Sequence, residues 1–189
     1  LDDILTELGH SVTDLGNLKP QDTDIPEHDN LIALPQTVGW TRTLHKAAKD
    51  AAPKGLPIFL GGDHSLSLGS VTGIADYAAG IGKPLFVLWL DAHSDFHTPQ
   101  STASGNLHGT PVAYLSGQAG FDNFPVVANR VPTENICLIG LRSVDPAENA
   151  ALSITDIAIA DMRAIDEGGI RAPLAEFLAK VEAANGLLH

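Results

Sequence analysis

The sequence feature that most restricts the fold is the run LFVLWL at positions 85–90, which contains six apolar residues and no polar one. A strand with one face in solvent alternates apolar and polar residues, whereas an uninterrupted apolar run indicates a strand that is buried on both faces. Strands of that kind belong to parallel sheets whose faces are covered by helices. We therefore predict a three-layer α/β fold, with a central, mostly parallel sheet between two layers of helices.

Other segments fit this architecture, because short apolar runs alternate with segments of helical spacing along the chain. Strands are predicted at 12–15, 56–60, 135–141, 154–159 and 186–189, and helices at 1–8, 37–52, 65–79, 108–115 and 171–184. No repeat, low-complexity tract or long linker divides the 189 residues, so we expect one domain over 1–189.

Composition limits the classes of partner and the compartment. The formal net charge of -12 lacks the basic footprint that nucleic acids or anionic membranes require, although it is compatible with a cationic substrate. No apolar stretch approaches the roughly 18 residues of a membrane-spanning helix. We therefore expect that the protein binds neither nucleic acid nor a membrane. The single cysteine, Cys137, lies in an apolar run. It excludes a disulfide framework and favours a reducing compartment, so we expect a cytoplasmic protein.

Polar clusters directly follow three of the predicted strands. They are GGDHS at 61–65, DAHSDFH at 91–97 and GLRSVDPAE at 140–148. Ligands of open parallel sheets bind outside the carboxyl ends of the strands. The three clusters are therefore expected to meet at one edge of the sheet and to form a single site.

The middle cluster carries the sharpest chemical signal. Asp91, His93 and Asp95 occupy alternate positions, and in an extended segment alternate side chains point to one side. Two adjacent carboxylates repel each other unless a cation neutralises them. A hydrogen-bonded polar loop is the alternative, but His64 at a neighbouring strand end favours a metal site. Oxygen and nitrogen ligands without thiolates suit manganese best, with iron, cobalt, nickel or zinc as other possibilities.

The segment SGNLHG at 104–109 places a histidine, His108, at a predicted junction between loop and helix. Glycines on both sides allow a ligand to approach the backbone closely. A histidine in such a place can act as a general acid or base near neutral pH, although a surface or capping histidine is the alternative.

Together, GGDHS, DAHSD, SGNLHG and the run IGLRSVDPAE at 139–148 resemble the successive signatures of the ureohydrolases, and the last resembles the arginase version of its block. The resemblance implies an α/β fold with two Mn²⁺ ions. It further implies that a manganese-activated hydroxide hydrolyses the guanidinium group of L-arginine to ornithine and urea. Members of the family commonly form trimers or hexamers, so a homo-oligomer is expected.

The resemblance also implies roles for individual residues. His64 and Asp95 would bind the first metal ion, and His93 would bind the second. Asp91 would bridge both ions. His108 matches the histidine that transfers a proton to the leaving amine.

Further residues match positions around the substrate. Ser104, Asn106 and Asp145 correspond to contacts with the amino acid part of arginine. Glu148 lies where the family has an acid close to the substrate pocket. His97 replaces the asparagine of animal arginases, and it can still hydrogen-bond a substrate carboxylate.

The resemblance implies two further metal-binding carboxylates, on a strand that would follow the last residue of this chain. It also implies a first strand that would precede Leu1. We therefore expect the domain to be incomplete at both ends and to bind metal weakly by itself. Because His97 and Ser143 depart from many arginases, agmatinase, guanidinobutyrase and formimidoylglutamase are alternatives within the family. An inactive metal-binding fragment or assembly module is an alternative of another class, and an unrelated metallohydrolase is the third.

Overall fold

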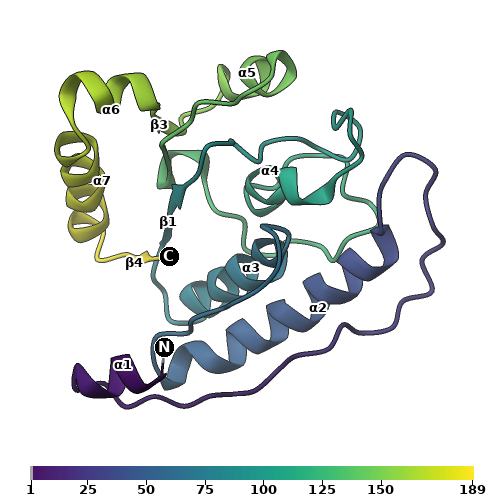
Figure 1. Cartoon of the computed structure of the whole chain (residues 1–189), viewed down its shortest axis with the longest axis horizontal. Helices are drawn as coiled ribbons and strands as arrows, with labels where there is room; N and C mark the ends of the chain where they lie inside the picture. The colour runs from purple at the N-terminus through teal and green to yellow at the C-terminus, as the bar shows by residue number, and fades with distance from the viewer. Residues whose placement is uncertain (1) are drawn as a thin grey trace.

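A parallel sheet of four short strands forms the centre of the computed structural model, which describes residues 2–189 (Figure 1). The strands are β1 (Leu85–Leu90), β2 (Ile136–Ile139), β3 (Ala158–Ala160) and β4 (Leu187–Leu188). Their order is β3-β2-β1-β4, and every pairing is parallel. The run at 85–90 thus forms an inner strand, which confirms the prediction made from its uninterrupted apolar character.

Helices and short 3-10 turns connect the strands. The helices are α1 (Asp2–Glu7), α2 (Leu34–Ala51), α3 (Leu66–Gly80), α4 (Pro111–Leu115), α5 (Pro146–Leu152), α6 (Met162–Gly168) and α7 (Arg171–Ala183). The 3-10 turns are η1 (Ala52–Lys54), η2 (Leu107–Gly109) and η3 (Thr133–Asn135). No helix within residues 2–189 combines the length and the apolar character that crossing a bilayer demands.

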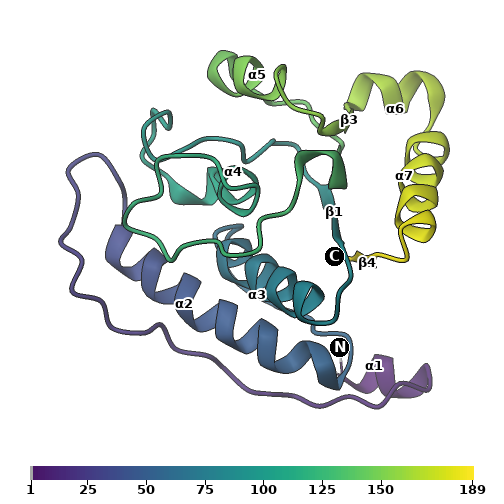
Figure 2. The same cartoon turned by 180° about the vertical axis from the view of Figure 1, so that it is seen from behind.

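The two faces of β1 pack against different helices, as the pleat of a strand requires. Val87 and Trp89 belong to the core that includes residues of α3 and α4. Phe86 points into a second core, where its ring meets the edge of Phe177 from α7 at a centroid distance of 5.9 Å. Figures 1 and 2 show α3 and α7 on opposite sides of β1. The predicted three-layer arrangement is confirmed.

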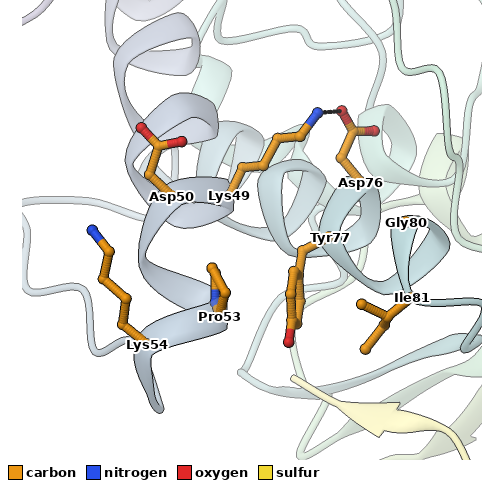
Figure 3. Close-up of a pocket in the computed structure, with 8 residues that line it drawn as sticks. All are labelled: Lys49, Asp50, Pro53, Lys54, Asp76, Tyr77, Gly80 and Ile81. Carbon is orange, nitrogen blue, oxygen red and sulfur yellow. Dashed lines mark hydrogen bonds and ion pairs between the residues drawn. The ribbon is translucent and has the colours of Figure 1, made fainter.

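Helices α2 and α3 lie side by side and pack unusually closely. The approach depends on Gly69 and Gly73, because a Cβ atom at either position would collide with the backbone of α2. Asp76 of α3 also reaches across to α2, where its carboxylate lies 3.2 Å from Lys49 Nζ. Figure 3 shows this pair beside a shallow cavity of about 580 Å³ at the ends of the two helices.

Two predicted strands do not form. Residues 12–15 belong to an irregular segment that runs along α2, where Gln21 N donates to Gly39 O at 3.2 Å. Residues 56–60 have no strand partner within 2–189, and Leu56 and Leu60 are 86% and 79% exposed. An apolar run becomes a strand only where a neighbour accepts its backbone hydrogen bonds, so these two predictions were wrong.

The other boundaries moved by a few residues. The strand predicted at 154–159 begins only at Ala158, because Thr155 first closes a turn on Leu152. The helix predicted at 108–115 is split into η2 and α4, and Pro111 stands at the first turn of α4. Leu1, the first residue of the predicted helix 1–8, lies outside the described residues.

Candidate metal centre

The carboxyl end of β1 brings two of the predicted clusters together. Asp91 directly follows β1, and His64 lies in the turn that leads into α3. His64 Nδ1 is 2.8 Å from Asp91 Oδ2 and 2.8 Å from Asp95 Oδ2. One ligand atom from each of the three residues lies within 4.8 Å of the others, which is a spacing that can hold a metal ion.

The backbone of Asp95 turns this carboxylate toward His64. Asp95 is buried and has a left-handed backbone, with φ of 48°. Its carbonyl oxygen accepts hydrogen bonds from the N–H groups of Val112 at 3.0 Å and Ala113 at 3.4 Å, at the start of α4. The interpretation of 91–95 as an extended segment with alternating side chains was therefore wrong, although Asp91 and Asp95 do converge.

His93 stands at the edge of this group. Its Nδ1 lies 3.5 Å from Asp91 Oδ1, and its side chain is 61% exposed. The two oxygens of Asp91 thus face different histidines, Oδ2 toward His64 and Oδ1 toward His93. Asp91 therefore lies between the two imidazoles, with one carboxylate oxygen near each of them.

Burial and charge shift the protonation of the three converging residues in different directions. Burial raises the pKa of Asp95 above its usual value. Burial also opposes ionisation of Asp91, but the backbone N–H of His93 and the charge of His64 together lower the pKa of Asp91. Burial disfavours a charged His64, yet the neighbouring carboxylates of Asp95 and then Asp91 raise its pKa.

One buried atom in the group lacks a hydrogen-bond donor. Asp95 Oδ2 is buried and accepts no hydrogen bond within residues 2–189. His64 Nδ1 lies close to it, but a single ring nitrogen cannot donate to Asp95 and Asp91 at once. A buried carboxylate oxygen left without a donor costs free energy unless a cation compensates it. The oxygen and nitrogen donors present here suit a divalent metal ion.

A second cluster lies at the start of α5. His97 Nε2 is 2.7 Å from Asp145 Oδ2 and 3.8 Å from Glu148 Oε2. On the other side of the ring, His97 Nδ1 is 3.0 Å from Ser101 Oγ. The clusters 91–97 and 140–148 therefore meet, as their places at the ends of β1 and β2 predicted.

The side chain of Asp145 caps α5 and is also partly exposed to solvent. Its side chain caps α5 by accepting hydrogen bonds from the backbone N–H groups of Ala147 at 2.9 Å and Glu148 at 3.0 Å. The N–H of Glu148, together with His97, lowers the pKa of the Asp145 carboxyl. The Asp145 side chain is 47% exposed and remains open to a ligand.

Glu148 is held in the interior. Its Oε1 accepts hydrogen bonds from Ser94 Oγ at 2.5 Å and from Phe96 N at 3.2 Å. Its Oε2 accepts from Asp145 N at 3.3 Å, which completes a capping box at the start of α5. The sequence does not reveal these contacts, because Ser94 carries no signal beyond its position between the predicted ligands His93 and Asp95.

The remaining predicted residues lie on the loop 104–109. Ser104 Oγ accepts from Asn106 N at 3.3 Å, and the side chains of Ser104 and His108 are exposed. Within the described residues no hydrogen bond joins the side chain of Asn106 or His108 to either cluster. The nearest link is through the backbone, where His97 N donates to Gly109 O at 3.1 Å. A cavity of about 810 Å³ beside Ser104 is lined by residues from 28–32, 99–104 and 120–123.

Comparison with known proteins places this arrangement in a family. The model of the Arginase family matches residues 3–189. The arginase of Brucella melitensis biotype 1 is 52% identical over 190 residues, which cover 99% of this chain and 62% of the relative. The arginase of Agrobacterium fabrum is 50% identical over 192 residues, covering 100% of this chain and 59% of the relative. The chain therefore spans about three fifths of the length of these curated relatives.

Solved structures agree with the sequence comparison. The arginase of Bacillus cereus superposes with a TM-score of 0.83 at 28% identity, over 98% of this chain and 62% of the other. The formimidoylglutamase of Bacillus subtilis superposes less well, with a TM-score of 0.60 at 25% identity, over 84% and 44% of the two chains. The fold is thus more similar to this arginase than to this formimidoylglutamase.

Proposed function

The chain belongs to the arginase family, and from this premise we propose that the protein hydrolyses L-arginine to L-ornithine and urea at a metal centre. The single observation that carries the proposal is the convergence of His64, Asp91 and Asp95, in which the buried Asp95 Oδ2 has no hydrogen-bond donor. The identity to curated arginases supports the substrate and the reaction.

We propose two Mn²⁺ ions as the cofactor. His64, Asp91 and Asp95 would hold one of them, and Asp91 with His93 would contribute to the second. The two oxygens of Asp91 support a shared ligand, because they face different histidines. Such a pair of ions, when bound, supplies the positive charge that activates water at neutral pH and stabilises the developing negative charge.

Residues of the chain would carry the proton transfer. When water attacks the guanidinium carbon and the C–N bond breaks, the leaving amine must gain a proton. We propose His108 as the donor, because its exposed imidazole can exchange a proton with solvent. The hydrogen bond from His97 N to Gly109 O ties the backbone next to His108 to the second cluster.

The second cluster would bind the amino acid part of the substrate. The exposed carboxylate of Asp145 suits an ammonium group. His97 Nε2 lies 2.7 Å from Asp145 Oδ2, so the imidazole borders the same region and would contact the substrate carboxylate. Ser104 and Asn106 would add polar contacts from the loop 104–109. This arrangement favours a substrate with an amino acid head group over agmatine, which has none.

Urea release by the full-length protein, loaded with MnCl₂, tests the proposed reaction. The substrates to compare are L-arginine, agmatine, 4-guanidinobutyrate and N-formimino-L-glutamate, with formamide measured for the last. We expect turnover of L-arginine above all others, and a loss of at least about 100-fold in Asp91→Asn. Asp50→Asn, a matched change at an exposed site, should keep wild-type activity.

Preferred turnover of agmatine, 4-guanidinobutyrate or N-formimino-L-glutamate would replace the proposed substrate while keeping the metal centre. Manganese binding without release of any product would favour the non-catalytic alternative. A cytoplasmic location and assembly into a trimer or hexamer are further proposals. Light scattering of the purified protein tests the assembly.

A further inference from the structure

Glu148 joins the two clusters, and its contacts point to a role that differs from substrate binding. We propose that Glu148 is a positioning residue, which fixes the turn that carries Asp95 and thereby prepares the metal centre. This inference rests on the proposed metal-dependent function. It concerns how the chain holds one of the proposed ligands in place.

The burial of Glu148 shows that its carboxylate serves the interior of the protein. Its side chain is 7% exposed, and glutamate is rarely buried to this degree unless its oxygens are paired. Both oxygens are paired here, since Oε1 accepts from Ser94 and Phe96, and Oε2 accepts from Asp145 N.

The two donors to Oε1 lie on either side of Asp95 in the chain. Asp95 has the left-handed backbone conformation that residues other than glycine adopt at a cost. Such a conformation persists only where the surroundings hold it. Glu148 holds the turn through the hydroxyl of Ser94 and the N–H of Phe96, and α4 holds it through the carbonyl of Asp95.

The direction of the Asp95 carboxylate depends on this turn. Its Oδ2 is buried 2.8 Å from His64 Nδ1, so a small rotation of the backbone would move it away from the histidine. A ligand aligned before the ion arrives binds the ion more tightly, and partners of a metal ligand commonly contribute 10- to 100-fold in affinity. Glu148 acts one step further out, through the residues on both sides of the ligand.

The substrate-facing acid of α5 is then Asp145 alone. The side chain of Asp145 is 47% exposed, whereas that of Glu148 lies beneath it. Glu148 Oε2 is 3.8 Å from His97 Nε2, which is too long for a hydrogen bond. The position predicted from the sequence as a substrate contact therefore lies under the substrate region and supports the turn 94–96.

Two substitutions separate this role from substrate contact in the full-length protein. Ser94→Ala removes one hydrogen bond to Glu148 and leaves the acid itself in place. Glu148→Gln replaces one acceptor oxygen with an amide donor, which opposes either Asp145 N–H or the donors at 94–96. Asp145→Asn serves as the comparison on the substrate side. Thermal unfolding of the metal-free proteins identifies any variant that fails to fold.

The readouts are the Mn²⁺ dissociation constant, from paramagnetic resonance of free Mn²⁺, and KM for L-arginine at saturating Mn²⁺. We expect Ser94→Ala and Glu148→Gln to weaken Mn²⁺ binding by about tenfold or more, with KM changed by less than about twofold. Asp145→Asn should show the reverse pattern. Unchanged Mn²⁺ affinity with a raised KM in Glu148→Gln would overturn the inference.

The same data distinguish failure of the inference from failure of the proposed function. If the wild-type protein binds Mn²⁺ but releases no urea, the proposed reaction fails, and the Mn²⁺ dissociation constants still decide the role of Glu148. If the wild-type protein releases urea while Ser94→Ala and Glu148→Gln bind Mn²⁺ normally, the inference alone fails. Absence of Mn²⁺ binding in the wild-type protein would overturn both.

Discussion

The imidazole of His64 stacks on the indole of Trp89, with the ring centroids 4.1 Å apart and the planes inclined by 24°. Trp89 belongs to β1 and is buried in the core beneath α3 and α4. The stack fixes one proposed metal ligand against the strand whose end supplies the next one, Asp91. The hydrophobic core thus determines where the imidazole lies before any ion binds.

Substituting Trp89 should therefore weaken metal binding. Loss of an aromatic stack is worth about 0.5–1.5 kcal/mol, so we expect Trp89→Leu to bind Mn²⁺ roughly two- to twelvefold more weakly. Isothermal titration calorimetry measures the change. Trp40→Leu, at the partly buried tryptophan of α2, is the matched control and should retain wild-type affinity. Equal affinities in the two variants would show that the stack does not orient His64.

The close contact between α2 and α3 gives a prediction about stability. Gly69→Ala would force a methyl group against the backbone of Thr41. Overpacking of this kind should lower the free energy of unfolding by about 2 kcal/mol. Gly80→Ala, at the end of the same helix, meets open space and should be neutral or stabilising by about 0.5 kcal/mol. Urea denaturation measures both, and similar effects would contradict the packing described.

The parts of this fold that sequence predicted best are those decided locally. The run at 85–90 forms β1 with the predicted bounds, because six apolar residues leave few alternatives to a buried strand. The helix predicted at 65–79 is α3, Leu66–Gly80. The equally apolar run at 56–60 forms no strand, because strand formation needs a partner that no local pattern reveals.

The same distinction applies to the site. The motifs correctly predicted that His64 and Asp91 meet, although the segment 56–60 before His64 does not form the predicted strand. The left-handed turn at Asp95 could not be predicted, because it depends on Glu148 and on the start of α4, which are distant in sequence. The pairing of His97 with Asp145 likewise depends on how α5 begins.

The reactivity of Cys137 tests the core between the sheet and α7. The thiol lies in β2 and is 2% exposed, and burial raises its pKa, so the reactive thiolate is disfavoured. We expect no reaction with 5,5′-dithiobis(2-nitrobenzoic acid) in the native protein over an hour. In guanidinium chloride the thiol of Cys137 should react completely. Rapid labelling without denaturant would contradict the burial of β2 beneath α7.

The cap of α5 should make stability depend on pH. Asp145→Ala removes an N-cap, which costs about 1 kcal/mol at neutral pH. Because the folded state lowers the pKa of Asp145, its carboxylate stabilises the protein above the unfolded pKa of about 3.9. That contribution is lost as pH falls through the lower folded pKa. Denaturant unfolding should give a difference in the free energy of unfolding between the wild type and Asp145→Ala that is constant from about pH 5 to about pH 7. The difference should be smaller in stronger acid. A difference that grows in acid would contradict the sign.

The most direct test of the proposed metal centre is anomalous diffraction at the manganese edge from crystals of the full-length protein grown with MnCl₂. We predict a peak enclosed by His64, Asp91 and Asp95, within bonding distance of Asp95 Oδ2. Manganese peaks elsewhere with none at this position, or a peak only at the cluster of His97, Asp145 and Glu148, would contradict the account.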